Sequence, residues 1–124
     1  MQAMTEPILH ITTAAAWAAA RRDGVYRTST LEDEGFIHLS NPDQVTEVAD
    51  VLYRGRTDLV LLCVNPDRIA AELRYEALTT DAPFPHLYGP LNLEAIVRFV
   101  PFPPLPDGTF QLPAEAGRLE PYSV

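Results

Sequence analysis

The chain contains no lysine and a single cysteine, and these two features exclude several kinds of site. Without lysine there is neither a Schiff-base lysine nor the lysine of a phosphate-binding loop. A single cysteine allows neither a disulfide within the chain nor a zinc–thiolate cluster. Cys63 lies in the apolar run 59–64, where it is expected to be a buried apolar residue and a poor nucleophile.

Long apolar runs and clusters of basic residues are missing as well. No stretch approaches the ~18 apolar residues of a membrane-spanning helix, and the first residues lack the basic and then apolar layout of a signal peptide. The 17 acidic residues outnumber nine arginines, for a net charge of −8, and no segment gathers the arginines. We therefore expect a cytoplasmic protein with neither a nucleic-acid nor a membrane partner.

Three common catalytic motifs are also absent, namely GxGxxG, GxSxG and HExxH. Rossmann dinucleotide folds, serine hydrolases and zinc proteases of the HExxH type therefore have no support. An arginine-containing site for a small anion stays open, and so does the oligomeric state.

The residues that are present fit one compact domain, because 47% of the 124 residues are apolar. Helix-like and strand-like patterns alternate along the first two-thirds, whereas nine of the 12 prolines follow Ala82. We expect a single α+β domain over residues 5–112 and a C-terminal tail over 113–124, either packed down or mobile.

Local patterns predict six strands, a turn and a loop. The strands are expected at residues 8–11, 25–28, 36–40, 59–64, 73–78 and 95–100. The run 59–64 is apolar on both faces and is therefore typical of a central strand. Residues 31–35 predict a polar turn, and residues 81–91 predict a loop rich in proline and aromatics that could line a site.

Two main helices are expected between these strands. Thr12 or Thr13 caps an alanine-rich helix that ends at Gly24 and in which Trp17 is expected to anchor the core. The second helix has Asn41 as N-cap, Pro42 at its first position, Gln44 completing a capping box and Gly55 as its stop. Its apolar stripe is formed by Val45, Val48, Ala49 and Leu52.

The three histidines are the first candidates for chemistry, because an imidazole titrates near neutral pH. His10, His38 and His86 are 28 and 48 residues apart, which is not the short spacing of a metal site, so we expect no metal. His10 is expected to be a strand histidine bonded to backbone. It is not a catalytic candidate.

His38 and His86 each lie in a segment that suggests a ligand. Period-two alternation puts His38 and Ser40 on one face of a strand just before a helix, where the ring, the hydroxyl and free helix N–H groups could bind a phosphate or carboxylate. The alternative is that Ser40 only caps the helix. His86, Tyr88 and Gly89 lie between two prolines that stiffen a binding rim, or else these residues merely cover a sheet edge.

Other polar residues have weaker patterns. Arg27 and Ser29 form a polar strand end that either contacts an anion or is simply solvated. Glu76 alternates with Arg74 on one strand face, where a solvated pair is the commoner arrangement and a catalytic carboxylate the alternative.

Four segments together resemble the bacterial family catalogued as domain of unknown function 952. They are Tyr26–Ser29, Gly35–Ser40 with Gln44, Tyr75–Glu76, and Pro85–Leu91, and the resemblance covers about residues 7–100. The combination of GFIHxS with PHxYGPL is specific, although either string alone is weak. The resemblance implies a fold similar to that of ADP-ribosyltransferases, with small mixed or antiparallel sheets forming a cleft and two main helices packed on them.

The same resemblance implies candidate roles at an NAD-binding cleft. His38 is the best match for a ribose-contacting histidine, and Tyr88 or Tyr26 could stand for the tyrosine that stacks on nicotinamide. Glu76 is the nearest acid for the transferase glutamate, although the order along the chain gives no complete His-Tyr-Glu set. The catalytic candidates are therefore His38, His86, Tyr88 and Glu76. The candidate ligand-binding residues are Arg27, Ser29, Ser40, Gln44 and Gly89.

The function expected from the sequence is binding of a small anionic, phosphorylated or nucleotide-like ligand. The cofactor is unknown, with NAD as one candidate, and any enzyme would carry out NAD-dependent ADP-ribosyl or phosphate transfer. The alternative is a non-catalytic ligand-sensing or protein-interaction module, in which PHLYGPL and the proline-rich tail form a surface for another protein.

Overall fold

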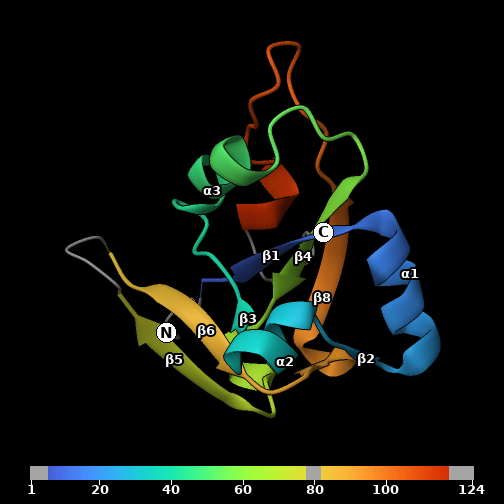
Figure 1. The fold of residues 1–124 in the computed structure, drawn as a ribbon, viewed down its shortest axis with the longest axis vertical. Helices are drawn as coiled ribbons and strands as arrows, with labels where there is room; N and C mark the ends of the chain where they lie inside the picture. Colours follow the sequence, from blue (N-terminus) through green and yellow to red (C-terminus); the bar gives the residue numbers. More distant parts are fainter. Residues whose placement is uncertain (1–5, 78–81, 118–124) are drawn as a thin grey trace, which may run out of the picture.

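The computed structural model describes residues 6–77 and 82–117, and its strands form three antiparallel sheets (Figure 1). The sheets have the orders β1-β4-β8, β2-β7 and β3-β6-β5. The strands are β1 (Ile8–Thr13), β2 (Val25–Tyr26), β3 (Ile37–His38), β4 (Leu59–Val64), β5 (Glu72–Glu76), β6 (Phe84–Tyr88), β7 (Leu91–Asn92) and β8 (Ile96–Pro101). The helices are α1 (Ala14–Asp23), α2 (Ser29–Glu34) and α3 (Val45–Leu52), and short 3-10 turns span Pro66–Arg68, Leu93–Ala95 and Ala114–Gly117. The expected α+β class is confirmed.

Strand β4 lies at the centre of the sheet β1-β4-β8, as its two-sided apolar pattern predicts. All six of its residues are buried. Alternate side chains of a strand point to opposite faces, so β4 contributes to a core on each side of the sheet. One core contains Val60, Leu62 and Val64, and the other contains Leu59, Leu61 and Cys63.

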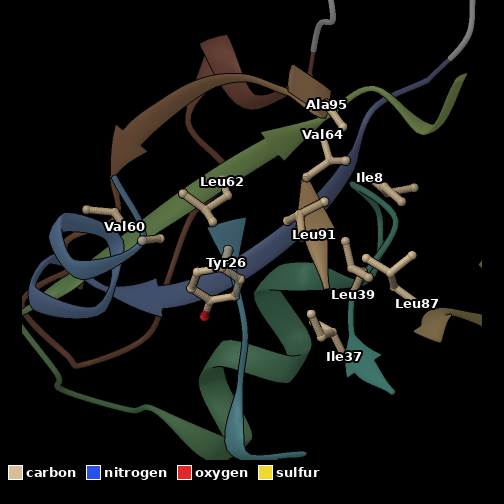
Figure 2. Close-up of a cluster of buried hydrophobic side chains, with 11 residues drawn as sticks. Ile8, Tyr26, Ile37, Leu39, Val60, Leu62, Val64, Leu87, Leu91 and Ala95 are labelled. Carbon is tan, nitrogen blue, oxygen red and sulfur yellow. The ribbon is translucent and has the colours of Figure 1, made fainter. Parts of the chain in front are cut away.

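The first core lies between the central sheet and the two smaller sheets (Figure 2). It contains Ile37 of β3, Leu87 of β6 and Leu91 of β7, each 0% exposed. Trp17 of α1 is partly buried against its edge. The sheet β3-β6-β5 packs on this core with one face only, and the other face of the sheet is polar.

The second core lies on the opposite face of the central sheet, under α3 and the C-terminal segment. Phe102 is 0% exposed there, and its ring centroid lies 4.8 Å from that of Phe110. Ala116, within the predicted tail, is also 0% exposed in this core. Residues 113–117 therefore pack on the domain, and residues 118–124 lie outside the described part.

The caps of α1 agree with the prediction. Thr13 Oγ1 accepts a hydrogen bond of 3.0 Å from the Ala16 N–H, and Gly24 ends the helix. No helix in residues 6–77 and 82–117 is long and apolar enough to cross a bilayer.

The prediction of a polar turn at residues 31–35 is wrong, because this segment belongs to the short helix α2. Thr28 Oγ1 accepts the Leu31 N–H at 3.2 Å, so Thr28 is the N-cap. Gly35 has φ +92 and closes the helix, a conformation that glycine adopts without strain. The strand predicted at 25–28 is correspondingly shorter and ends at Tyr26.

The prediction of a loop at residues 81–91 is also wrong, because residues 84–88 form β6, the middle strand of its sheet. Proline lacks the N–H that a strand normally donates. Pro85 is tolerated because β3 pairs only with His86 and Leu87, so the missing N–H lies at the end of the β3–β6 ladder. The Pro85 carbonyl still accepts the Leu39 N–H at 3.0 Å.

Helix α3 begins later than predicted, and its stripe is narrower. Its first residue is Val45, it ends at Leu52 rather than near Gly55, and no side chain caps its N-terminus. Asn41 is therefore not the N-cap. Val45 and Ala49 are 0% exposed, but Leu52 is 66% exposed, so Leu52 does not belong to the buried stripe.

Candidate functional site

The polar face of the sheet β3-β6-β5 brings together residues that are far apart in the sequence. His86 pairs with His38 on β3 and with Arg74 on β5, so these three side chains project from the same side of the sheet. The neighbours Ile37 and Leu87 point into the first core. We define the polar face as Phe36, His38, Glu72, Arg74, Glu76, His86 and Tyr88, with Glu34 of α2 at its edge.

Glu76 is the centre of the hydrogen bonding on this face. Its Oε1 atom lies 2.8 Å from His86 Nδ1 and accepts a hydrogen bond of 2.6 Å from the Tyr88 hydroxyl. These bonds, with that from Tyr88 as the larger cause, hold the pKa of Glu76 below its usual value. The same Tyr88–Glu76 bond raises the pKa of Tyr88. The carboxylate is therefore ionised and the phenol neutral at neutral pH.

Phe36 covers His86. The two rings are stacked with centroids 4.2 Å apart and an interplanar angle of 21°. Phe36 also lies 4.8 Å from the His38 ring and 5.2 Å from the Tyr88 ring. His86 is thus buried under an aromatic side chain, with 6% of its surface exposed.

His38 lies beside His86 but is open to solvent. Its Nε2 atom lies 3.1 Å from Glu34 Oε1, and both side chains are about half exposed. The His38 and His86 ring centroids are 5.3 Å apart, in an edge-to-face arrangement. Glu34 reaches His38 because Gly35 ends α2 and turns the chain directly into β3.

Arg74 borders the face on the side of β5. Its guanidinium carbon lies 4.4 Å from the centroid of the Tyr88 ring, a cation–π contact. The same guanidinium donates hydrogen bonds of 2.9 and 3.2 Å to the two carboxylate oxygens of Glu72. Its charge is therefore already paired within the strand.

The sequence suggested Ser40 and Gln44 for an anion site, and in the structure both residues make other contacts. Ser40 is buried, and its backbone pairs with Leu9. The Gln44 Oε1 atom accepts the Asn41 N–H at 2.8 Å, and Gln44 Nε2 donates to the Pro83 carbonyl at 3.0 Å. Both ends of the Gln44 side chain are therefore occupied in joining the start of α3 to the segment before β6.

The other three predicted ligand-binding residues lie outside the hydrogen-bonded cluster. Arg27 and Ser29 are exposed near the start of α2. In the described part of the chain no hydrogen bond or ion pair joins either of them to Glu76 or to the histidines. Gly89 is needed for packing, because a Cβ atom added there would lie 2.6 Å from the Ala71 Cβ. The close approach at Gly89 is therefore to the protein's own chain.

His10 has the structural role that the sequence indicated. Its Nδ1 atom lies 2.7 Å from the His38 carbonyl oxygen, and its Nε2 atom lies 2.8 Å from the Tyr26 hydroxyl. Burial lowers the pKa of His10 to about 4. Tyr26, the alternative to Tyr88 in the resemblance, is 4% exposed in the core and does not lie on the polar face.

Sequence reasoning missed Glu34 and the covering role of Phe36. The i, i+4 spacing of Glu34 and His38 was a usable signal, although such a spacing is usually interpreted within one helix. Phe36 shares a period-two face with His38, which was the signal for its position.

In the described part of the chain no three histidine, cysteine or acidic side chains lie close enough together to hold a metal ion.

Residues 11–99 match the family described as "Protein of unknown function (DUF952)". The chain belongs to this family. The resemblance inferred from the two motifs is therefore confirmed, and the polar face lies entirely within the matched region. A search of curated proteins found no match.

Solved structures of CC0527 from Caulobacter crescentus are similar to this DUF952 chain over most of its length. A crystal structure of CC0527 has 35% sequence identity, covers 89% of this chain and 97% of its own, and gives a TM-score of 0.81. The solution NMR structure has 36% identity, covers 86% and 92%, and gives a TM-score of 0.75. CC0527 therefore has a fold similar to the one described above.

Proposed function

We propose that the polar face binds a small nucleoside-like ligand. The observation that carries the proposal is the Glu76 carboxylate, which is held ionised by His86 and Tyr88 while its second oxygen, Oε2, has no hydrogen-bond partner in the described part of the chain. Ionised carboxylates are strong acceptors for ligand hydroxyl groups. Glu76 is 35% exposed and can be reached by such a group.

The aromatic side chains around Glu76 support a ligand with a planar ring. The Phe36 ring lies 4.8 Å from the half-exposed His38 ring and 5.2 Å from the Tyr88 ring, measured between centroids. Aromatic rings stack favourably in offset or edge-to-face geometries. A nucleoside combines a planar base with sugar hydroxyls and matches this combination.

The charges of the face favour the nucleoside part of such a ligand over its phosphates. Two carboxylates lie on the face, those of Glu72 and Glu76, a third, that of Glu34, lies at its edge, and Arg74 is already bonded to Glu72. Like charges repel, so phosphate groups would extend away from these carboxylates. NAD and ADP-ribose, which the resemblance to NAD-binding transferases implies, stay candidate ligands through their ribose and ring parts.

Thermal melting with and without ligand tests the proposal. Adenosine, ADP-ribose and NAD at millimolar concentration should each raise the Tm, because a ligand that binds only the folded state adds RT ln(1 + [L]/Kd) to stability. Tyr88→Phe and His38→Ala should each weaken binding about fivefold or more, as expected for one lost hydrogen bond of about 1 kcal/mol.

Tyr75→Phe is the matched control, because Tyr75 carries a phenol on the same strand as Glu76 but points to the other side of the sheet. Its ligand-induced shift should equal that of the wild type. Absence of any shift with all three probes would contradict the proposal.

A protein-interaction role is the second candidate, and one observation favours it. Val51 and Leu52 at the end of α3 are 76% and 66% exposed, which is unusual for adjacent large apolar side chains. A protein-binding surface made by PHLYGPL has less support, because most of that segment is β6, the middle strand of the sheet β3-β6-β5. If Val51→Ser abolishes binding of a partner protein but leaves the ligand-induced Tm shift unchanged, this surface has a role separate from the polar face.

A further inference from the structure

The two histidines of the polar face use opposite ring nitrogens to contact carboxylates. His86 approaches Glu76 through Nδ1, and His38 approaches Glu34 through Nε2. A carboxylate only accepts hydrogen bonds, so in the neutral rings His86 carries its proton on Nδ1 and His38 carries it on Nε2. The lone pair that remains is therefore on Nε2 in His86 and on Nδ1 in His38.

The free nitrogen of His86 reaches solvent although the residue is buried. Its Nε2 atom has no hydrogen-bond partner in the described part of the chain. In the described residues, only Trp17 Nε1 is a fully buried side-chain nitrogen or oxygen atom without a hydrogen-bond partner. Because His86 Nε2 has no partner and does not belong to that group, it has a surface accessible to a ligand or to water.

The groups around His86 hold the ring in place. Phe36 stacks on one face of the imidazole, and the His38 ring meets it edge to face. Glu76 and Arg74 lie on the neighbouring strand β5, with Arg74 directly opposite His86 in the register. A ring held on a sheet by a stacked neighbour and a carboxylate has little freedom to rotate, which is what a catalytic imidazole requires.

We propose that His86 is the general base of this site, and that Glu76 positions it. This inference rests on the proposed function for its ligand, which is a nucleoside-like molecule that carries an ester or glycosidic bond. His86 Nε2 accepts the proton of a ligand hydroxyl or of water. Glu76 fixes the Nδ1–H tautomer and stabilises the imidazolium that forms, and Tyr88 keeps Glu76 ionised.

The proton transfer balances without any further reactant. As the O–H proton moves to His86 Nε2, the oxygen electron pair forms a bond to the electrophilic carbon or phosphorus of the ligand. The bond from that atom to the leaving group breaks, and the leaving group takes the electron pair and then the proton from Nε2. No electrons are gained or lost, so neither an oxidant nor a reductant is needed.

Long-range 1H–15N spectra of the full chain without ligand test the assignment. In the neutral form of the ring, His86 should show a protonated Nδ1 and an unprotonated, pyridine-type Nε2. His38 should show the reverse pattern. A proton on His86 Nε2 in the wild type would overturn the proposal.

Two alanine variants on one strand separate positioning from general structural effects. Glu76→Ala removes the acceptor and should shift His86 towards the Nε2–H tautomer that free imidazoles prefer in water. Glu72→Ala, on the same face of β5, should leave the His86 signals in place. An unchanged tautomer in Glu76→Ala would remove Glu76 from the positioning role, and if this variant fails to fold the wild-type spectrum still decides.

Reaction with diethyl pyrocarbonate provides an independent readout, because the reagent acylates unprotonated imidazole nitrogens. His86 should be acylated in the wild type, whereas buried His10, whose two nitrogens are both bonded, should react only on unfolding. An unreactive His86 would overturn the proposal. If His86 has the expected tautomer and reactivity but no probe shifts the Tm, the nucleoside ligand is wrong; if ligands bind and the tautomer is reversed, the general base is wrong.

Discussion

The three histidines show how much one side-chain type depends on its surroundings. His38 is open to solvent beside Glu34, and His86 lies under Phe36 beside Glu76. His10 is buried, and its two ring nitrogens contact the His38 carbonyl and the Tyr26 hydroxyl. Desolvation disfavours the charged imidazole, which is why burial lowers the pKa of His10 to about 4. His10 is therefore a neutral part of the framework behind the polar face.

The pH dependence of stability should report on His10. Between pH 6.5 and about 4 the unfolded chain binds a proton at His10 that the folded protein does not bind, so the free energy of unfolding should fall as the pH falls through this window. The loss should be about 3 kcal/mol. Urea denaturation at several pH values in this range gives the free energy of unfolding as a function of pH. The slope of that free energy against pH should be clearly smaller for His10→Gln than for the wild type.

The slopes of the two proteins should agree above pH 6.5, where His10 is neutral in both states. Glu76 affects stability in a different pH range. Because its pKa in the folded protein is lowered from its usual value of 4.5, its stabilising effect is lost only as the pH falls below about 4.5. Equal slopes for His10→Gln and the wild type between pH 6.5 and 4.5 would show that His10 is not the group responsible.

At the scale of elements, short connections decide how the polar face is assembled. Helix α2 supplies Glu34 and ends at Gly35, which turns the chain into β3. Gln44 joins the turn before α3 to the Pro83 carbonyl just before β6. The start of the strand that carries His86 is thus linked to the start of a helix that packs on the opposite side of the molecule.

Substitution of Gln44 should therefore cost more than substitution of Asn41. Gln44→Ala removes two hydrogen bonds of a residue that is 9% exposed, and should lower the free energy of unfolding by about 1–2 kcal/mol. Asn41→Ala should change it by under about 0.5 kcal/mol, because the Asn41 side chain does not cap α3. Chemical denaturation of both variants checks this, and a larger loss for Asn41→Ala would restore the capping role predicted from the sequence.

At the scale of the whole molecule, the central sheet is covered on both faces. The smaller sheets cover one face, and α3 with the C-terminal segment covers the other (Figures 1 and 2). The proline-rich segment after β8 returns across the second core and inserts Phe110 and Ala116 there. Residues expected to form turns and a tail therefore complete the fold of the central sheet.

Removal of an apolar side chain from this C-terminal cover should destabilise the whole domain. Phe110→Ala leaves a cavity beside the Phe102 ring and should lower the free energy of unfolding by about 3 kcal/mol. Leu105→Ala, in the same segment but 40% exposed, should lower it by under about 1 kcal/mol. A loss for Phe110→Ala as small as that expected for Leu105→Ala, measured by urea denaturation, would mean that the segment is not part of the cooperative unit.

Several features followed from the sequence alone, because each depends on residues that are close together in the chain. The two-sided apolar run of β4, the Thr13 and Gly24 ends of α1 and the backbone-bonded His10 are of this kind. The two motifs also determined the family, which the match over residues 11–99 confirms.

Only the tertiary structure decided where the polar residues meet. His38, Glu76 and His86 come from three strands, and their contacts depend on the register in which β6 pairs with β3 and β5. Local propensity could not reveal this register, because the proline-rich composition of residues 81–91 masks a strand that is stabilised by its neighbours on both sides. The pairing of β6 with β5 likewise brings His86 Nδ1 to Glu76, whereas His38 Nε2 contacts Glu34 only four residues away.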